Sequence, residues 1–138
     1  MTEKSFKRDV DNLGDIYRFA EDIMLDNDIE DAVRFPIQLA LEELFVNLVT
    51  YNPAAKRDIL IDMEIANHGV TVTMTDHDAA KFDVTRAAQV DTGAALEDRK
   101  PGGLGLHLIQ HMVDRLEYDY RDGRSRIRFS KEPESDDV

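Results

Sequence analysis

A carboxylate and an amide lie four positions apart in a strongly apolar segment, at Glu43 and Asn47. If this segment is a helix, both side chains project from the same patch of its surface. Buried polar groups need a hydrogen-bond partner or a ligand, and oxygen donors of this kind suit Mg²⁺, which completes its shell with water and phosphate oxygens. The pair is therefore a candidate metal site. The alternative is that it faces solvent or bonds to a neighbouring loop.

A second candidate site is the glycine-rich run Pro101-Gly102-Gly103-Leu104-Gly105-Leu106, which leads into a predicted helix. Glycines let backbone N–H groups approach a bound anion, and a helix N-terminus adds unsatisfied donors and a favourable dipole. Arg99 and Lys100 stand just upstream and could neutralise a triphosphate. The run fits neither the Walker A nor the Rossmann spacing. A flexible joint between loop and helix is the alternative.

Two further carboxylates follow a predicted strand, in the sequence Asp76-His77-Asp78. A carboxylate held at a strand end can accept a hydrogen bond from an exocyclic amino group such as that of adenine. Acidic residues are also common where a strand passes into a loop. This pattern alone therefore does not distinguish a ligand from an ordinary loop residue.

The helices that must position these residues follow from hydrophobic periodicity. Apolar residues at spacings of three and four predict an amphipathic helix from Ser5 to about Leu25, with Ser5 as its N-cap. Pro36, placed in a first turn, predicts a second helix that runs to about Tyr51 and is ended by Pro53. Apolar residues cover most of the circumference of this second helix, so it should be largely buried. They are Phe35, Ile37, Leu39, Leu41, Leu44, Phe45, Val46, Leu48 and Val49.

Alternating apolar residues predict two β-hairpins. The paired segments are Asp58–Ile65 with Val70–Thr75 around Asn67-His68-Gly69, and Leu116–Tyr120 with Arg126–Phe129 around Asp122-Gly123. A helix from Leu104 to Arg115 precedes the second hairpin. This order of elements predicts an α+β fold in which one sheet carries its helices on a single face.

The composition limits the classes of protein that need to be considered. A length of 138 residues fits a single domain, and the absence of cysteine excludes disulfides, thiolate metal sites and cysteine nucleophiles. The net charge of −12 should repel nucleic-acid backbones and anionic membranes. No apolar stretch is long enough to span a membrane, and the first residues lack a signal-peptide segment. We therefore expect a cytoplasmic protein that binds neither nucleic acid directly nor membranes.

Taken in order, the motifs resemble the GHKL ATP-binding fold shared by histidine kinases and gyrase-type ATPases, and within it the bacterial anti-sigma-factor serine/threonine kinases. Three segments carry the resemblance, which spans roughly residues 10 to 131. They are Leu41-Glu42-Glu43-Leu44-Phe45-Val46-Asn47 for the N box, Asp76 to Asp83 for the first glycine box and Arg99 to Leu106 for the second.

The resemblance implies an α+β two-layer sandwich of the Bergerat (GHKL) type, with a mixed sheet of about four to five strands and helices packed on one face. A single ATP-binding domain would extend over residues 1–131, followed by an acidic disordered tail over residues 132–138.

The resemblance also implies roles for individual residues. Asn47 would coordinate the Mg²⁺ that bridges the ATP phosphates, Glu43 would act as a general base or as a carboxylate that orients water, and Asp76 would hold the adenine amino group. Residues 80–100 would form a lid over ATP. The residues that would contact the phosphates are Arg99, Lys100, Gly102, Gly103, Leu104 and Gly105.

The middle motif departs from the family pattern, which has Asp-x-Gly followed shortly by Phe-Asp or Phe-Asn. Here Asp78 stands where glycine would follow Asp76, and Phe82 lies one residue too far along. In a second register Asp78 is the adenine ligand, but Phe82 is then too close. An inserted residue or an altered adenine pocket would account for this departure.

The function implied by the resemblance is that of an ATP- and Mg²⁺-dependent anti-sigma factor in a partner-switching pathway. Such a protein phosphorylates a serine of an anti-anti-sigma (STAS-type) partner and sequesters a sigma factor. The altered middle motif favours an alternative, a non-catalytic binding module of the same fold. The acidic surface suits a basic partner, and the resemblance suggests a possible homodimer.

Overall fold

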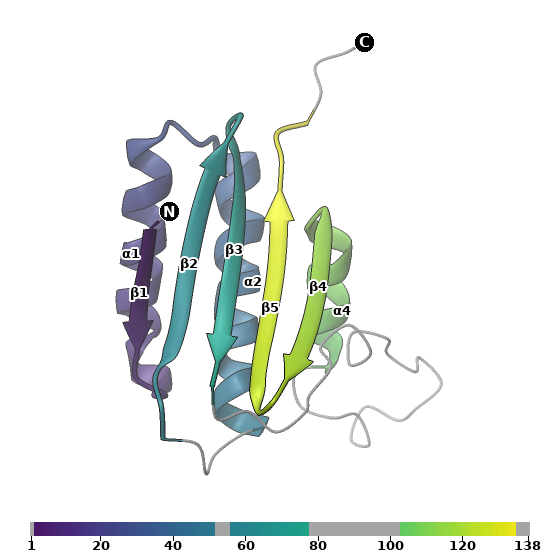
Figure 1. Ribbon diagram of the computed structural model, residues 1–138. Coiled ribbons are helices and arrows are strands. Elements are labelled where there is room, and N and C mark those ends of the chain that lie inside the picture. Colours follow the sequence, from purple (N-terminus) through teal and green to yellow (C-terminus); the bar gives the residue numbers. More distant parts are fainter. Residues whose placement is uncertain (1, 52–55, 78–102, 135–138) are drawn as a thin grey trace.

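The structure is a computed structural model that describes residues 2–51, 56–77 and 103–134. Within these residues, a five-stranded sheet carries three α-helices on one of its faces (Figure 1). The strands are β1 (Thr2–Phe6), β2 (Ile59–Ala66), β3 (Gly69–Asp76), β4 (Arg115–Arg121) and β5 (Arg124–Lys131). The helices are α1 (Leu13–Asp26), α2 (Asp31–Tyr51) and α4 (Gly103–Met112), and a 3₁₀ turn, η1 (Val10–Asn12), precedes α1. The expected α+β sandwich with its helices on one face is confirmed.

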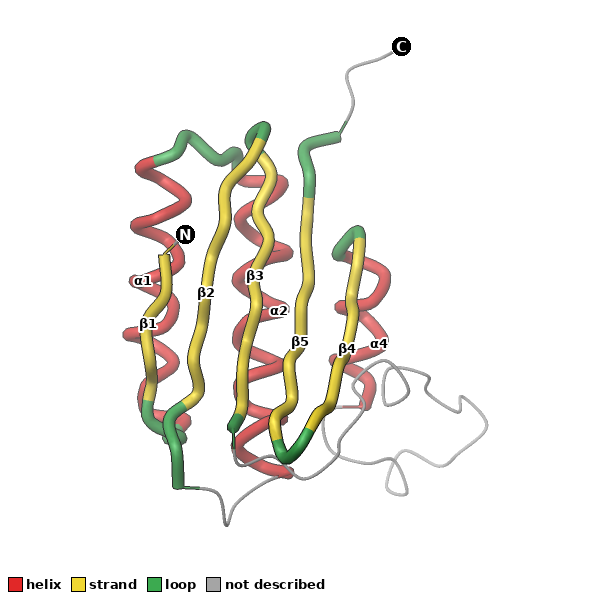
Figure 2. The backbone as a smooth tube through the Cα atoms, viewed as in Figure 1, coloured by secondary structure: helices red, strands yellow, loops and turns green. Residues whose placement is uncertain are grey.

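The strand order is β1-β2-β3-β5-β4, and every described pair of neighbours is antiparallel (Figure 2). The expectation of a mixed sheet is therefore wrong. After α4 the chain enters the sheet at its edge as β4, reverses at a tight turn and returns as β5 beside β3. That reversal makes β5 antiparallel to β3, because the crossover through α4 ends at the sheet edge rather than next to β3.

The N-terminal segment begins with a strand, so the predicted helix from Ser5 is wrong at its start. Ser5 pairs with Leu60 of β2 instead of capping a helix, and α1 begins only at Leu13. Phe6 is buried at 5% exposure and packs edge-on against Phe19, with ring centroids 5.5 Å apart. Pairing with β2 thus overrides a local apolar spacing that also fits a helix.

Helix α2 begins at Asp31, five positions before Pro36, so the prediction that Pro36 lies in the first turn is wrong. Most of the apolar residues of α2 are buried as expected, but Phe35 is 65% exposed. The fully buried side chains of α2 form the centre of the core between helices and sheet. They are Val33, Ile37, Ala40, Leu41, Leu44 and Phe45, with Leu48 at 4% exposure.

Both predicted hairpins are confirmed. Asn67 and His68 join β2 to β3 with φ of 53° and 64°, and Asp122 and Gly123 join β4 to β5 with φ of 52° and 79°. Two successive residues with positive φ match the right-handed twist of the paired strands. The alternation along these strands directs one set of side chains into the core and the other set to the face without helices.

The three sequence motifs converge because of the way the elements run. Helix α2 and strand β3 end, and helix α4 begins, at the same end of the sheet (Figure 1). Residues more than 50 positions apart in the sequence therefore meet at one end of the sandwich.

None of the described helices is both long enough and apolar enough to cross a membrane.

Candidate functional site

Two of the motifs meet where Glu43 of α2 lies against Gly105 of α4. A Cβ atom placed on Gly105 would lie 2.5 Å from Cδ of Glu43, closer than real carbon atoms approach, and 3.1 Å from its Cγ, which is tighter than most real contacts. In the conformation that Glu43 has here, only glycine at position 105 leaves room for its side chain against the first turn of α4. The structure therefore brings the carboxylate of the first motif directly onto the glycine-rich motif.

Asn47 lies one turn after Glu43 and is 3% exposed. Its Nδ2 donates a hydrogen bond of 2.6 Å to the main-chain oxygen of Glu43. This bond fixes the amide and occupies its donor end, which leaves the amide oxygen as the end suited to a cation. The described residues contain no cluster of three or more His, Cys, Asp or Glu side chains that could hold a metal ion. The donor set thus fits a cation such as Mg²⁺ that also binds phosphate oxygens, and not a site built from protein ligands alone.

Asp76 lies at the end of β3 and points to the helix-covered face, where it is 1% exposed. Its Oδ1 forms an ion pair with Nη2 of Arg8. The Arg8 side chain is itself only 7% exposed, and its Nε donates a hydrogen bond of 2.8 Å to the main-chain oxygen of Arg57. The carboxylate predicted to bind adenine is therefore already matched by a buried positive charge.

Arg8 is the residue at this site that the sequence motifs do not indicate. It lies in the short connection between β1 and η1, a segment that the periodicity assigned to a helix. Pairing of β1 with the edge of β2 carries Arg8 to the end of the sheet where β3 finishes. Arg8 is one of 17 lysines and arginines in the sequence, and nothing in the sequence says which carboxylate it meets.

Several predicted site residues lie outside the described residues: Asp78, Arg99, Lys100 and Gly102, together with the expected lid over residues 80–100. Gly103 and Leu104 open α4, one residue earlier than the predicted start at Leu104. The structure thus brings Glu43, Asn47 and the first residues of α4 together. It places Asp76 at the same end of the molecule and adds Arg8 beside it.

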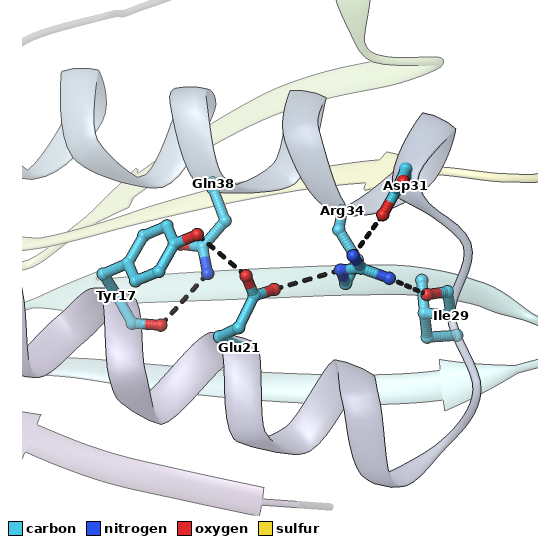
Figure 3. Close-up of polar contacts among 6 residues, drawn as sticks. All are labelled: Tyr17, Glu21, Ile29, Asp31, Arg34 and Gln38. Carbon is cyan, nitrogen blue, oxygen red and sulfur yellow. Dashed lines mark hydrogen bonds and ion pairs between the residues drawn. The ribbon is translucent and has the colours of Figure 1, made fainter.

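A separate hollow of about 630 Å³ lies between α1 and α2. Figure 3 shows the polar contacts that cross it: Gln38 Nε2 donates to the main-chain oxygen of Tyr17 at 3.0 Å, and Arg34 Nε lies 3.1 Å from Glu21 Oε1. The Tyr17 hydroxyl donates to Glu21 Oε2 at 2.8 Å, and this hydrogen bond together with the charge of Glu21 raises the pKa of Tyr17. We call this hollow the α1–α2 groove. Its lining includes Leu41 and Glu42 of the N box but none of the residues predicted to bind the nucleotide.

Residues 6–131 match the histidine kinase-like ATPase domain family, and the chain belongs to that family. It is 30% identical over 107 residues to the serine/threonine-protein kinase BtrW of Bordetella bronchiseptica, a match that covers 75% of each protein. Among solved structures, the chain is similar to the histidine kinase AdeS of Acinetobacter baumannii, with a TM-score of 0.46 and 16% identity over 95% of this chain and 67% of that one. The membership expected from the motifs is therefore confirmed.

Proposed function

We propose that this chain is an ATP-dependent protein kinase that transfers the γ-phosphoryl group to a serine or threonine of another protein. The contact between Glu43 and Gly105 carries the proposal: a carboxylate lies against the first turn of α4, and a helix N-terminus favours a bound phosphate, so this carboxylate could accept a proton from a hydroxyl that attacks such a phosphate. The similarity to BtrW, which is named a serine/threonine-protein kinase, supports the class of acceptor.

In this proposal Glu43 accepts the proton of the acceptor hydroxyl. The hydroxyl oxygen forms a bond to the γ-phosphorus as the bond from that phosphorus to the leaving oxygen of ADP breaks. The N–H groups at the start of α4, from Gly103 onward, orient the phosphate oxygens. Asn47 would hold Mg²⁺ through its amide oxygen, and the ion when bound supplies positive charge close to the phosphates.

We further propose that the partners are an anti-anti-sigma (STAS-type) protein as phosphoacceptor and a sigma factor that the chain sequesters in the cytoplasm. The α1–α2 groove supports a basic partner. Its charged lining comprises three carboxylates, Glu21, Asp31 and Glu42, and a single arginine, Arg34, which already pairs with Glu21 and Asp31. Affinity for a sigma factor should therefore fall as salt rises, and a salt-insensitive affinity would contradict this assignment.

Nucleotide binding is tested by calorimetric titration with ATP, with and without Mg²⁺. We expect Mg²⁺-dependent binding that weakens at least about tenfold, or about 1.4 kcal/mol, in Asn47→Ala. Asn27→Ala is a matched control, because Asn27 also donates its Nδ2 to the oxygen four residues earlier but lies at the end of α1. Equal losses in both variants, or no binding at millimolar ATP, would overturn the proposed kinase.

Catalysis is tested by following labelled γ-phosphate onto a candidate STAS-type protein. Glu43→Gln keeps the size of the side chain against Gly105 but removes the base. We expect this variant to bind ATP and to transfer phosphate about 10²–10⁴-fold more slowly. Transfer at the original rate would exclude Glu43 as the base.

The second candidate function is a non-catalytic binding module of the same fold, and the buried pair of Arg8 with Asp76 favours it. A carboxylate that already bonds an arginine has less capacity to accept a hydrogen bond from adenine. Partner capture without nucleotide binding would support this candidate, and Mg²⁺-dependent ATP binding followed by phosphoryl transfer would exclude it.

A further inference from the structure

One row of buried residues crosses the sheet near the end where α2 ends and α4 begins (Figure 1). Asp76 of β3 is the register partner of Ile59 in β2 and of Ser125 in β5. Ile59 is in turn the partner of Phe6 in β1. All four residues are buried, and Asp76 is the ionisable one among them. Its charge therefore needs a partner from outside the row.

The Arg8 side chain supplies that partner from a connection between elements. Arg8 stands two residues after the end of β1, and its Nη2 forms the ion pair with Oδ1 of Asp76. Its Nε donates a hydrogen bond of 2.8 Å to the main-chain oxygen of Arg57. A guanidinium presents its N–H donors in a fixed fork, so one orientation of the group makes both contacts.

The backbone around Arg8 is held by contacts that do not involve the Arg8 side chain. The main-chain oxygen of Lys7 accepts hydrogen bonds from the main-chain N–H of Asp9 at 2.8 Å and from Nδ2 of Asn12 at 2.9 Å. Lys7 and Asp9, on either side of Arg8, are both exposed. Rotation about the bonds of the Arg8 side chain can therefore carry its guanidinium from Asp76 to solvent while the connection keeps its shape.

From this arrangement we infer that Arg8 is an internal competitor of the nucleotide base. Arg8 and the exocyclic amino group of adenine are alternative partners of the Asp76 carboxylate, so the base binds when the guanidinium turns out to solvent. The inference rests on the proposed ATP binding with Asp76 as the ligand of the base. It adds that Arg8 sets the affinity, because the apparent affinity is reduced by the fraction of chains in which Arg8 has left Asp76.

The sign of the effect distinguishes competition from simple charge attraction. In a chain with a net charge of −12, a positive charge near a triphosphate should by itself strengthen nucleotide binding. A competitor has the opposite effect, because the ion pair of Arg8 with Asp76 must break before the base can reach the carboxylate. Both side chains are almost fully buried, so salt screens this pair only weakly. Removal of Arg8 should therefore tighten ATP binding.

Calorimetric titration with ATP and Mg²⁺ tests this sign. Arg8→Ala removes the competitor and should bind ATP about tenfold or more tightly than the parent chain. Arg8→Lys keeps the charge, but its ammonium group cannot reproduce the forked contacts, so a smaller gain is expected. Arg18→Ala removes the same charge from an exposed position of α1 and should keep the affinity within about twofold. Circular dichroism checks that each variant is folded.

A second nucleotide separates competition for Asp76 from a general change at the site. Purine riboside triphosphate lacks the exocyclic amino group of adenine, so it donates no hydrogen bond to Asp76 and leaves Arg8 in place. Arg8→Ala should therefore bind this nucleotide no more tightly than the parent chain does. Equal gains for both nucleotides would contradict the inference, because a general change at the site does not depend on the amino group.

A third measurement follows Arg8 in the parent chain and needs no variant. Phenylglyoxal modifies accessible guanidinium groups, and mass spectrometry of the resulting peptides locates each modified residue. Arg8, whose side chain is 7% exposed, should react slowly in the protein alone and faster when ATP and Mg²⁺ are saturating. Arg18, whose side chain is 74% exposed, should react at the same rate in both. If Arg8 stays equally protected when ATP is bound, the inference is wrong.

Failure of this inference can be told apart from failure of the proposed function. A parent chain that binds ATP as tightly as Arg8→Ala does would keep the proposed kinase and exclude the competition. Binding by Arg8→Ala but not by the parent chain would support the competition and exclude the proposed kinase. If neither the parent chain nor any Arg8 variant binds ATP at millimolar concentration, the proposed function and the inference both fail.

Discussion

At the scale of single residues, the contact between Glu43 and Gly105 decides how closely α4 approaches α2. The Glu43 side chain is half-buried and fills the space that a side chain at position 105 would need. Gly14 in α1 offers the contrast, because nothing lies within 4 Å of where its Cβ would be. Both glycines lie near a helix start, but only at position 105 does another side chain occupy the space that a Cβ would need.

This difference predicts opposite effects for the same substitution. Gly105→Ala should lower the free energy of unfolding by about 1–3 kcal/mol through overpacking, whereas Gly14→Ala should raise it by up to about 1 kcal/mol through helix propensity. Urea denaturation measures both. Adding Glu43→Ala should recover much of the loss at Gly105, because it removes the clashing atoms. If Gly105→Ala is as stable as Gly14→Ala, the close contact is not present in solution.

The ion pair of Arg8 with Asp76 is the other decisive feature at this scale. Both side chains are almost fully buried, and a buried ion that loses its partner is strongly destabilised. Arg8 also holds the main-chain oxygen of Arg57, just before β2. One arginine thus ties the end of β3, the start of β2 and the connection after β1 together at the candidate site.

At the scale of elements, strands β1 and β2 bring three carboxylates together on the face of the sheet that no described helix covers. Glu3 is the register partner of Asp62, and Glu64 lies two residues further along β2 on the same face. Burial is the main cause of the raised pKa of Asp62, followed by Glu64 and Glu3, and Arg128 from β5 opposes them. Pairing of β1 with β2 therefore brings Glu3 close to the Asp62 carboxylate, and Glu3 and Glu64 together disfavour its charged form.

The raised pKa predicts how stability changes with pH. Between the ordinary pKa of an aspartate, about 3.9, and the raised value, the folded chain binds the Asp62 proton more tightly than the unfolded chain does. Its contribution to stability therefore falls as pH rises through that window and stays low above it. Asp62→Asn should remove this dependence and be more stable than the parent at neutral pH, measured by urea denaturation of dilute protein. Asp22→Asn on α1 is the control, and an equal gain there would contradict the assignment.

At the scale of the whole molecule, the net charge of −12 opposes compaction. Many of the acids lie on exposed positions of α1 and the connection to α2, including Asp15, Asp22, Asp26, Asp28 and Glu30. Repulsion between exposed charges is screened by salt, whereas the buried pair of Arg8 with Asp76 is screened much less. The balance favours greater stability in salt.

We therefore expect the thermal midpoint of dilute protein to rise when NaCl increases from ~50 mM to ~0.5 M. Asp22→Arg reduces the net charge from −12 to −10 and should show a smaller rise. Differential scanning calorimetry measures both midpoints. A midpoint that falls with salt would mean that favourable ion pairs outweigh the repulsion.

The two hairpins and the position of the motifs were predictable because their signals are local. Turn residues at Asn67-His68 and Asp122-Gly123 adopt the positive φ that such hairpins require, and the alternation beside them decides which side chains face the core. The N box and the second glycine box likewise depend on spacing along one segment each. Local geometry suffices for these features, and the family that they indicated is confirmed.

The N-terminal strand, the fully antiparallel sheet and the partner of Asp76 were not predictable in the same way. Each depends on which distant segment a strand pairs with: β1 with β2, β5 with β3, and Arg8 with Asp76 across 68 positions. The sequence by itself determined the hairpins, most of the apolar core and the motifs that indicate the family, because periodicity, turn chemistry and motif spacing act over a few residues. Only the tertiary structure decided that Glu43 meets Gly105 and that Arg8 neutralises Asp76, because strand pairing and helix packing alone bring those residues together.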